Sequence, residues 1–303
     1  MKLKNLLSLL LLATLWGPSF LFIKIAVVEI APITLAALRI GLAAALLHVF
    51  LLFKGYEFNR SWKFWKHVTI AGFFAHAVPF ALINWGEQYI DSSIASILNG
   101  LTPLCTVLIA NYAIADERMT PEKVFGTIIG FIGLFVLVSP NLVSGMNASV
   151  WGIVAVAVAA LSYGIAIVYS RLHLMKEKPL YAPSSQLLVS AVYLIPFALI
   201  VEGPVVWTSL SWEAIGSLII LGSFGTALAF VIYYRILASA SASYLSLVTY
   251  LMPIYGVALG AIFLDEILTI EAIIGAGLIL LGIMIANKTI TIPLGGKKTI
   301  NVT

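Results

Sequence analysis

DERMTPEKVFG at residues 116–126 and DEILTIEAIIG at residues 265–275 are two versions of one stretch. Asp, Glu, Thr, Glu and Gly recur in the same order with the same gaps, at an offset of 149 residues (265 − 116), about half of the 303-residue chain. Further pairs recur at a similar offset: Gly133 and Gly282, Pro103 and Pro253, Gly17 and Gly164, and Lys24 and Arg171. Several matches in the same order in both halves predict an internal duplication.

The composition is typical of a membrane protein. Hydrophobic residues make up 61% of the chain, charged residues only 10%, and the mean hydropathy is +1.07. A soluble domain carries about 25% charged residues, so this chain is predicted to be an all-α integral membrane protein. The net charge of +4 indicates contact with anionic lipid rather than with nucleic acid. The single cysteine, Cys105, excludes an internal disulfide and a cysteine-based metal site.

Polar breaks divide the apolar sequence into ten predicted transmembrane helices, of which the fifth and the tenth are short. The N-terminus resembles a signal peptide, but its apolar run continues through Val28, which predicts an uncleaved first helix. The ten predicted spans are residues 5–28, 32–53, 68–89, 93–115, 124–139, 150–170, 182–201, 214–236, 243–264 and 271–287.

The basic residues predict an orientation for these spans. With the N-terminus in the cytoplasm, 15 of the 17 Lys and Arg residues fall on the cytoplasmic side, and the outer loops have none. The other two, Lys24 and Arg39, lie inside spans. This positive-inside pattern predicts that both termini are cytoplasmic, and it supports the count of ten.

The two copies of the opening stretch differ as this orientation requires. The inner copy has Arg118 and Lys123, and the outer copy has Ile267 and Ala272 at the same places. In both copies the Thr is a predicted helix N-cap, and the second Glu lies in the first turn of the helix that follows.

Because five is odd, the second half enters the membrane from the opposite side. This predicts a five-plus-five inverted-topology repeat, the architecture typical of secondary transporters. The predicted units are residues 5–139 with helices one to five, residues 150–288 with helices six to ten, and a short cytoplasmic tail at 289–303.

Several stretches resemble a known family. These are LWGPSFLFIKIAV at 15–27, APITLAALRIGLAAALL at 31–47, DSSIASILNGLTPLCTVLIA at 91–110, WGIVAVAVAALSYGIAIVYSRL at 151–172 and the long stretch from Gly225 to Ile285. Each half resembles an EamA domain, and together they are similar to a ten-helix member of the drug/metabolite transporter superfamily over about 5–288. The resemblance implies export or exchange of small metabolites, often amino acids, across the bacterial inner membrane.

Charged residues inside spans are the first candidates for the substrate pathway. Lys24 and Arg39 must face protein or water rather than lipid, because a central cation costs about 2.5–3.5 kcal/mol to insert. They are interpreted either as an anion-attracting pair or as structural groups, with Lys24 extending to the interface and Arg39 binding carbonyls or Glu87. Glu87 is in turn a candidate for carrying a proton or for binding a substrate amine, but an interfacial acid or a partner of one of these cations is the favoured interpretation.

Polar and aromatic residues near mid-span are the second group of candidates, because sites in such folds lie near the midplane. Each could instead join helices by packing or hydrogen bonding, and His48 is expected only to pack. The candidates are Trp16, Ser19, His76, Asn84, Asn99, Thr102, Tyr163, Tyr233, Tyr234 and Tyr250, with Pro18, Pro79, Pro103 and Pro253 as candidate helix kinks.

Small residues predict close helix contacts, mainly in the fifth and tenth spans, which are expected to be scaffold helices. They are Gly126, Gly130, Gly133, Gly256, Gly260, Gly275, Gly277 and Gly282.

The resulting hypothesis is a transporter that exports or exchanges small metabolites by alternating access, with amino acids or their analogues as the first candidates. An exporter of amphipathic cations or drugs is the alternative, which the aromatic residues and Glu87 would suit but Lys24 and Arg39 would not. An enzyme is disfavoured because no metal-ligand or nucleophile motif is evident, and a channel because no selectivity filter is. No cofactor, metal or nucleic acid is expected. The expected partners are a small-molecule substrate and the lipid bilayer, with a coupling proton and the oligomeric state left open.

Overall fold

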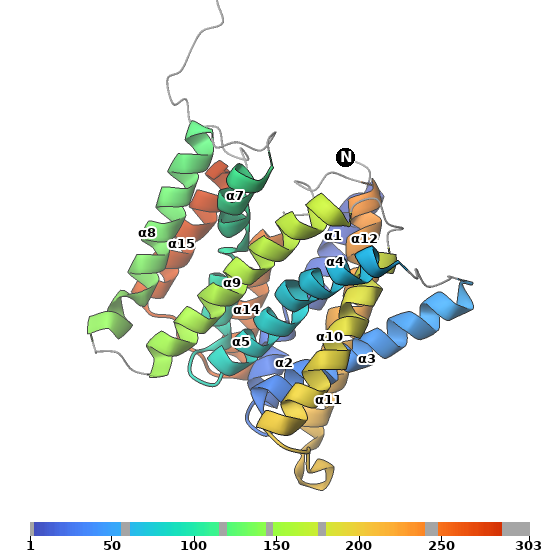
Figure 1. The fold of residues 1–303 in the computed structure, drawn as a ribbon. Helices are drawn as coiled ribbons and strands as arrows, with labels where there is room; N and C mark the ends of the chain where they lie inside the picture. The colour runs from blue at the N-terminus through green and yellow to red at the C-terminus, as the bar shows by residue number, and fades with distance from the viewer. Residues whose placement is uncertain are drawn as a thin grey trace, which may run out of the picture.

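The computed structural model describes residues 3–55, 61–114, 120–143, 148–174, 180–239 and 248–286. Within these ranges every regular element is a helix (Figure 1). The first half contains α1 (Leu3–Trp16), α2 (Ser19–Ala26), α3 (Pro32–Phe53), α4 (Trp62–Gly72), the π-helix η1 (Phe73–Ala77), α5 (Val78–Gly86), α6 (Ser92–Asn99), α7 (Thr102–Ala113) and α8 (Pro121–Val143). The second half contains α9 (Ala148–His173), α10 (Tyr181–Val201), the short 3₁₀-helix η2 (Trp207–Ser209), α11 (Trp212–Gly222), the π-helix η3 (Ser223–Leu228), α12 (Ala229–Ser239), α14 (Val248–Phe263) and α15 (Ile270–Ala286).

Seven stretches of helix in the described ranges are long and apolar enough to cross a membrane. They are Leu7–Ala26, Pro32–Phe53, Trp62–Gly86, Ser92–Ala113, Ser149–His173, Tyr181–Val201 and Trp212–Tyr233, and each overlaps one predicted span. The other three predicted spans correspond to α8, α14 and α15, of which α14 and α15 include shorter apolar helices. The predicted tail at 289–303 and the residues Asp116, Glu117 and Arg118 of the opening stretch lie outside the described ranges.

Two predicted boundaries were wrong. The fifth span, expected to be short, is α8, which has 23 residues. It begins at Pro121, a favourable first helical residue, and continues past Ser139, whose hydroxyl bonds the Val136 carbonyl within the helix. The third span begins at Trp62 rather than at 68. Its first turns, which are rich in lysine and tryptophan, already belong to helix α4.

Three of the four predicted proline kinks coincide with interrupted helices. Pro18 follows Gly17 at the break between α1 and α2, and Pro103 is the second residue of α7, just after the break that follows α6. Pro79 lies at the start of α5, directly after η1. Pro253 lies within an uninterrupted α14, so no break accompanies that proline.

Helices α8 and α15 pack side by side through glycines (Figure 1). A β-carbon on Gly126 would lie 2.5 Å from the Ala286 nitrogen and in contact with the Gly282 carbonyl, and one on Gly133 would lie 2.7 Å from the Gly275 carbonyl. These contacts are reciprocal: Gly126 corresponds to Gly275 in the sequence repeat, and Gly133 corresponds to Gly282. The predicted close packing of these glycines is therefore confirmed.

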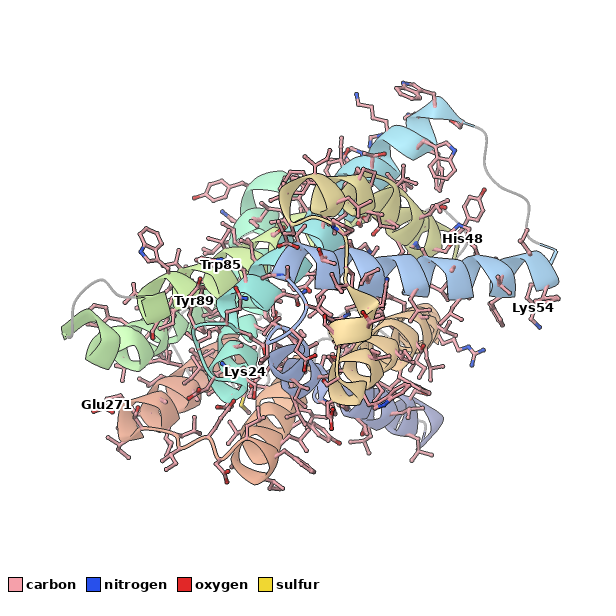
Figure 2. The ribbon with its side chains drawn as sticks, turned by 90° about the horizontal axis from the view of Figure 1, so that it is seen from below. Lys24, His48, Lys54, Trp85, Tyr89 and Glu271 are labelled. Carbon is pink, nitrogen blue, oxygen red and sulfur yellow. The ribbon has the colours of Figure 1, made fainter. Side chains whose placement is uncertain are left out.

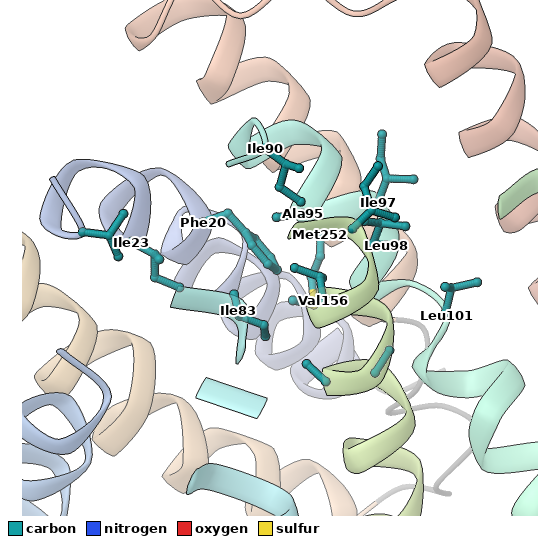
Figure 3. Close-up of a cluster of buried hydrophobic side chains, with 14 of the residues drawn as sticks. Phe20, Ile23, Ile83, Ile90, Ala95, Ile97, Leu98, Leu101, Val156 and Met252 are labelled. Carbon is teal, nitrogen blue, oxygen red and sulfur yellow. The ribbon is translucent and has the colours of Figure 1, made fainter. Parts of the chain in front are cut away.

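The largest apolar core joins helices of both halves around α9 (Figure 3). Phe20 and Ile23 of α2 meet Val156 of α9 and Met252 of α14 in this cluster. A second cluster lies between α3 and α10, where Ile40 and Leu187 are fully buried. The two halves are thus packed into each other, so the polar residues described next lie between elements of both.

Candidate functional site

Arg39 on α3 is buried between elements of both halves, with a side chain 6% exposed. Its Nε donates a 2.8 Å hydrogen bond to the Thr226 hydroxyl, and its Nη2 donates one of 3.4 Å to the Gly225 carbonyl. Its Cζ lies 4.2 Å from the centre of the Phe80 ring, a cation–π contact. Arg39 therefore binds carbonyl and hydroxyl oxygens, one of the two predicted arrangements, and forms no ion pair with Glu87.

The partners of Arg39 are held by the π-helix η3. The Thr226 hydroxyl donates to the Leu221 carbonyl at 2.8 Å, which leaves its lone pair for Arg39. A β-carbon on Gly225 would lie 3.0 Å from the Ser19 hydroxyl and 3.8 Å from Arg39 Nη2, so α2, α3 and η3 meet at this glycine. π-Helical turns inside α-helices are rare and are frequent at functional sites.

His76 lies in the other π-helix, η1, and is 1% exposed. Its position and that of Thr226 are 150 residues apart, and each π-helix follows a glycine, Gly72 or Gly222. The His76 ring contacts Phe80 and Phe230 edge to face, with Gln186 of α10 beside it. Neither ring nitrogen has a hydrogen-bond partner of acceptable geometry among the described residues.

Aromatic side chains surround Arg39 and His76. Trp16 contacts Phe230 and Tyr233 with ring centres 6.2 and 5.6 Å apart. Tyr163 on α9 packs against both main apolar cores and lies within electrostatic reach of Arg39. We call Arg39, His76, Ser19 and these aromatic residues, with Thr226 and Gln186, the central cluster. It brings together six predicted residues: Trp16, Ser19, Arg39, His76, Tyr163 and Tyr233.

Lys24, Asn84 and Glu87 form a second group, near the turn between α5 and α6. The Lys24 Nζ donates 2.7 Å hydrogen bonds to the main-chain oxygens of Glu87 and Ile90 (Lys24 is labelled in Figure 2). Lys24 therefore extends to the turn at the end of α5, where it binds two main-chain carbonyls. Asn84 donates to the Pro32 carbonyl at 3.0 Å. The Glu87 carboxylate is fully buried, with no hydrogen-bond partner among the described residues.

The remaining predicted residues lie apart or cannot be placed. Asn99 and Thr102 flank the break between α6 and α7, where neighbouring Gly100 faces Ile279 and Ile283 of α15. They are not part of the central cluster. The side chains of Tyr234 and Tyr250 lie outside the described part of the structure.

Three glutamates bind helix N-termini at the end of the molecule whose loops lack Lys and Arg. Glu202, after α10, accepts hydrogen bonds from the main-chain nitrogens of Ile33 and Thr34 at 3.0 and 2.7 Å and from the Thr34 hydroxyl at 2.7 Å. Glu29, before α3, accepts from the nitrogen and hydroxyl of Ser211 at 2.7 and 2.6 Å. The loops before α3 and α11 thus hold each other across the halves.

The third carboxylate is Glu266 of the opening stretch. It accepts 2.8 Å hydrogen bonds from the nitrogen and hydroxyl of Ser92, and further bonds from the nitrogen and hydroxyl of Ser93. Gly260 makes room for it, since a β-carbon there would contact the carboxylate. Asp265 has a positive φ of 54°, a conformation that Asp tolerates better than most residues. We call the bonds of Glu29, Glu202 and Glu266 the glutamate clamps.

The clamps favour ionised carboxylates, because helix N-termini carry partial positive charge. Partial burial of Glu266 opposes ionisation, but the hydrogen bonds from Ser93 and Ser92 outweigh it and hold its pKa below the ordinary value of 4.5. The hydroxyl and the main-chain N–H of Ser211 likewise lower the pKa of Glu29. A pocket of about 230 Å³ lies beside two of the clamps, with Glu29, Thr34 and Glu202 in its lining.

Sequence reasoning missed Thr226, Gln186, Phe230, Glu202 and Glu29, and it interpreted Glu266 only as part of a repeat. The repeat itself carries a signal for Thr226, because it pairs this residue with His76. The sequence signal for the clamps is weaker. It consists of a glutamate in an outer loop of one half and a serine or threonine at a helix start in the other half. Only folding shows which loop meets which helix.

The predicted helix N-caps are confirmed. The Thr120 hydroxyl accepts a bond from the Lys123 nitrogen at 3.4 Å, and the Thr269 hydroxyl accepts one from the Ala272 nitrogen at 3.2 Å. The two copies of the opening stretch therefore start α8 and α15 in the same way.

Comparison with known proteins matches both halves of the chain to one family. The model of the EamA-like transporter family matches residues 3–139 and 150–288. A solved crystal structure has a TM-score of 0.67 over 94% of this chain and 98% of its own, at 21% identity, which shows a shared fold.

Several curated relatives are named as transporters or as an efflux pump. An uncharacterized transporter of Archaeoglobus fulgidus is 33% identical over 287 residues, 94% of this chain and 99% of the relative. The uncharacterized transporter YoaV of Bacillus subtilis is 26% identical over 94% of this chain and 97% of its own. A probable amino-acid metabolite efflux pump of Escherichia coli is 25% identical over 91% of this chain and 92% of its own.

Proposed function

Because the chain belongs to the EamA-like transporter family, an assignment that makes it a membrane transport protein, we propose that it exports or exchanges small metabolites by alternating access. Amino acids or their analogues are the first candidate substrates. The name of the Escherichia coli relative, a probable amino-acid metabolite efflux pump, supports this class.

The transport unit in this proposal is a ten-helix, five-plus-five inverted repeat. The reciprocal glycine contacts of α8 with α15 support it, because a two-fold axis between inverted halves exchanges the Gly126–Gly282 pair with Gly275–Gly133. The two π-helices support it as well, because η1 and η3 start 150 residues apart. The repeats proposed are residues 5–139 and 150–288.

The proposed location is the bacterial inner membrane with both termini in the cytoplasm. The distribution of Lys and Arg supports this orientation. The clamp end of the molecule then faces outward. In the described state the clamps hold that end closed, and transport requires them to release so that the central cluster faces the other side.

The buried charge of Arg39 is the observation on which the substrate proposal rests. Arg39 is an enclosed cation whose hydrogen-bond partners are a hydroxyl and a carbonyl, so no ion pair among the described residues compensates its charge. A buried charge is costly unless it is paired, and a guanidinium binds carboxylates through two parallel bonds. A substrate carboxylate would supply the missing charge. His76, with Gln186 beside it, and the nearby aromatic rings would face the remainder of the substrate.

Glu87 is the proposed site of a coupling proton. Its carboxylate is fully buried and lacks a hydrogen-bond partner, so the uncharged, protonated form suits this closed state. Opening of the clamp end would admit water and allow the proton to leave.

The test is flux in proteoliposomes with amino acids and their amides as a matched pair of substrates. The amide keeps the ammonium and the side chain but lacks the carboxylate. We expect saturable flux for one or more amino acids, little for the corresponding amides, and loss of that flux in Arg39→Met. The matched control Lys54→Met, at the far tip of α3 (Figure 2), should transport normally.

The opposite preference would favour the alternative, an exporter of amphipathic cations. In that case amides and hydrophobic amines would move and amino acids would not, and Arg39→Met would transport them at least as well as the wild type. Saturable flux of no small solute would overturn the proposal as a whole. Flux that a proton gradient does not change would remove Glu87 from coupling.

A further inference from the structure

Four basic side chains gather at one corner of the molecule, away from the central cluster. We define the basic corner as Lys63, Lys66 and His67 of α4 with His173 at the end of α9. These two helices pack against each other, and three of the four side chains are exposed, with His67 half-buried. The corner lies at the opposite end of the molecule from the glutamate clamps.

The two histidines of the basic corner are held in a fixed arrangement. Their rings stack with centres 4.3 Å apart and an angle of 9° between planes. The Tyr169 hydroxyl bonds His67 Nδ1 at 2.8 Å, and the Tyr169 ring lies 4.5 Å from that of His173. This contact orients the His67 ring, and its Nε2 has no hydrogen-bond partner among the described residues.

The charge at the corner is not balanced by the helices that form it. His67 lies within electrostatic reach of Lys63, Lys66 and His173, which are all of the same sign when protonated. Helices α4, α9 and α10, which pack together at this corner, contain no Asp or Glu in their described sequence. Like charges this close repel one another unless an anion lies among them.

The surroundings indicate what kind of anion fits. Trp62, 82% exposed, and Leu172, 48% exposed, flank the basic side chains and present apolar surface beside them. Tryptophan next to basic residues at the end of a membrane helix is typical of the headgroup region of a bilayer. A soluble anion would use only the charges, whereas a phospholipid would also cover this apolar surface.

We propose that the basic corner binds the phosphate of an anionic phospholipid, with Lys63, Lys66 and the stacked histidines around the headgroup and Trp62 and Leu172 against its glycerol and upper acyl chain. The site is separate from the transport pathway, so it does not rest on the proposed function. It differs from general attraction to a negative surface because it uses one fixed histidine pair and one set of lysines.

The experiment measures binding to purified, delipidated full-length protein. The probes are dioleoylphosphatidylglycerol, dioleoylphosphatidylcholine and inorganic phosphate, followed by native mass spectrometry and by the thermal unfolding midpoint. We expect retained phosphatidylglycerol and a raised midpoint, with little effect from phosphatidylcholine or phosphate. Equal stabilisation by inorganic phosphate alone would overturn the lipid assignment.

The variants test the residues. Lys63→Gln with Lys66→Gln should weaken phosphatidylglycerol binding by about 25-fold, roughly five-fold for each lysine near an anionic surface. His173→Gln should weaken it as well, although the charge of the lysines is retained. Two control proteins should bind phosphatidylglycerol as the wild type does. One carries Lys63→Arg with Lys66→Arg, and the other carries Lys54→Gln, outside the basic corner. Unchanged binding in the correctly folded Gln variants, or an equal loss in Lys54→Gln, would overturn the site.

Discussion

The contact between Arg39 and Thr226 shows how single residues join the two halves. Arg39 comes from the first half and Thr226 from the second, and their 2.8 Å bond crosses 187 residues of sequence. The threonine hydroxyl accepts from the guanidinium while it donates within its own helix, so both of its roles are used. Loss of this hydroxyl should therefore leave the Arg39 Nε without its hydrogen-bond acceptor.

Thr226→Val tests that contact at the residue scale. Valine keeps the shape but leaves the Arg39 Nε buried without its acceptor, which should lower the free energy of unfolding by about 1–3 kcal/mol. Thr226→Ser retains the hydroxyl and is the matched control. Thermal unfolding of the purified protein in detergent gives the comparison, and equal midpoints for both variants would show that the bond contributes little.

Arg39→Lys tests whether the guanidinium or only its charge is needed. Lysine cannot reproduce the planar arrangement that binds Thr226, Gly225 and a substrate carboxylate together. Flux of the transported amino acid should fall about 10- to 100-fold, the effect of one hydrogen bond to a charged group. Wild-type flux in Arg39→Lys would mean that a point charge suffices.

The sequence identified most residues of the central cluster but not their partners. Arg39 and His76 stand out because polar groups are costly inside apolar spans. Thr226 and Gln186 carry no charge, and threonine is common in membrane helices, so only the packing of η3 and α10 reveals them. For Lys24, whose two carbonyl acceptors lie in the turn after α5, the residue was predictable but its contacts were not.

At the scale of elements, the α8–α15 pair depends on the absence of side chains at four glycines. A β-carbon on Gly126 would lie 2.9 Å from that of Ala286 and closer still to main-chain atoms of α15, which leaves no room for adjustment. Repeated small residues made this pairing predictable from sequence, although the full length of α8 was not.

Gly126→Val should destabilise the pair by about 1–3 kcal/mol, because overpacking forces the two helices apart. Gly277→Val is the matched control, since a β-carbon at this position meets nothing within 4 Å. The thermal unfolding midpoint of each variant in detergent is the measurement, and it should be lower for Gly126→Val than for Gly277→Val. Similar midpoints would contradict the close packing of α8 and α15.

The glutamate clamps are elements that the sequence could not predict, since each joins a loop of one half to a helix start of the other. Their stability should depend on pH. Because the pKa of Glu266 in the folded protein is lowered from 4.5, its ionised form stabilises the fold above that pH. This stabilisation is lost as the pH falls through the lowered value.

Glu266→Ala should therefore destabilise the protein by about 0.5–2 kcal/mol at neutral pH, as the loss of a helix cap does. The difference from the wild type should shrink as the pH falls below 4.5. Glu213→Ala, an exposed acid in the first turn of α11, is the control and should show a smaller effect. A difference that is independent of pH would contradict an ionised clamp.

At the scale of the whole molecule, duplication explains why distant stretches share one local structure. The composition, the span pattern and the repeated stretch predicted a helical membrane protein, and the family match confirms that the halves are related. How the halves interlock could not be predicted, because it depends on contacts such as Glu202 with α3. Alternating access requires these contacts to break and re-form in each cycle.

A reversible cross-link over the clamp end tests this requirement most directly. In a Cys105→Ala background, Thr34→Cys with Glu202→Cys would be bridged by a short, cleavable bifunctional thiol reagent in proteoliposomes. Val206→Cys with Ser209→Cys, within one turn of one loop, is the matched control. We predict that bridging Thr34→Cys with Glu202→Cys stops flux, that cleavage restores it, and that bridging the control pair has no effect. Undiminished flux in fully bridged protein would contradict alternating access through this end of the molecule.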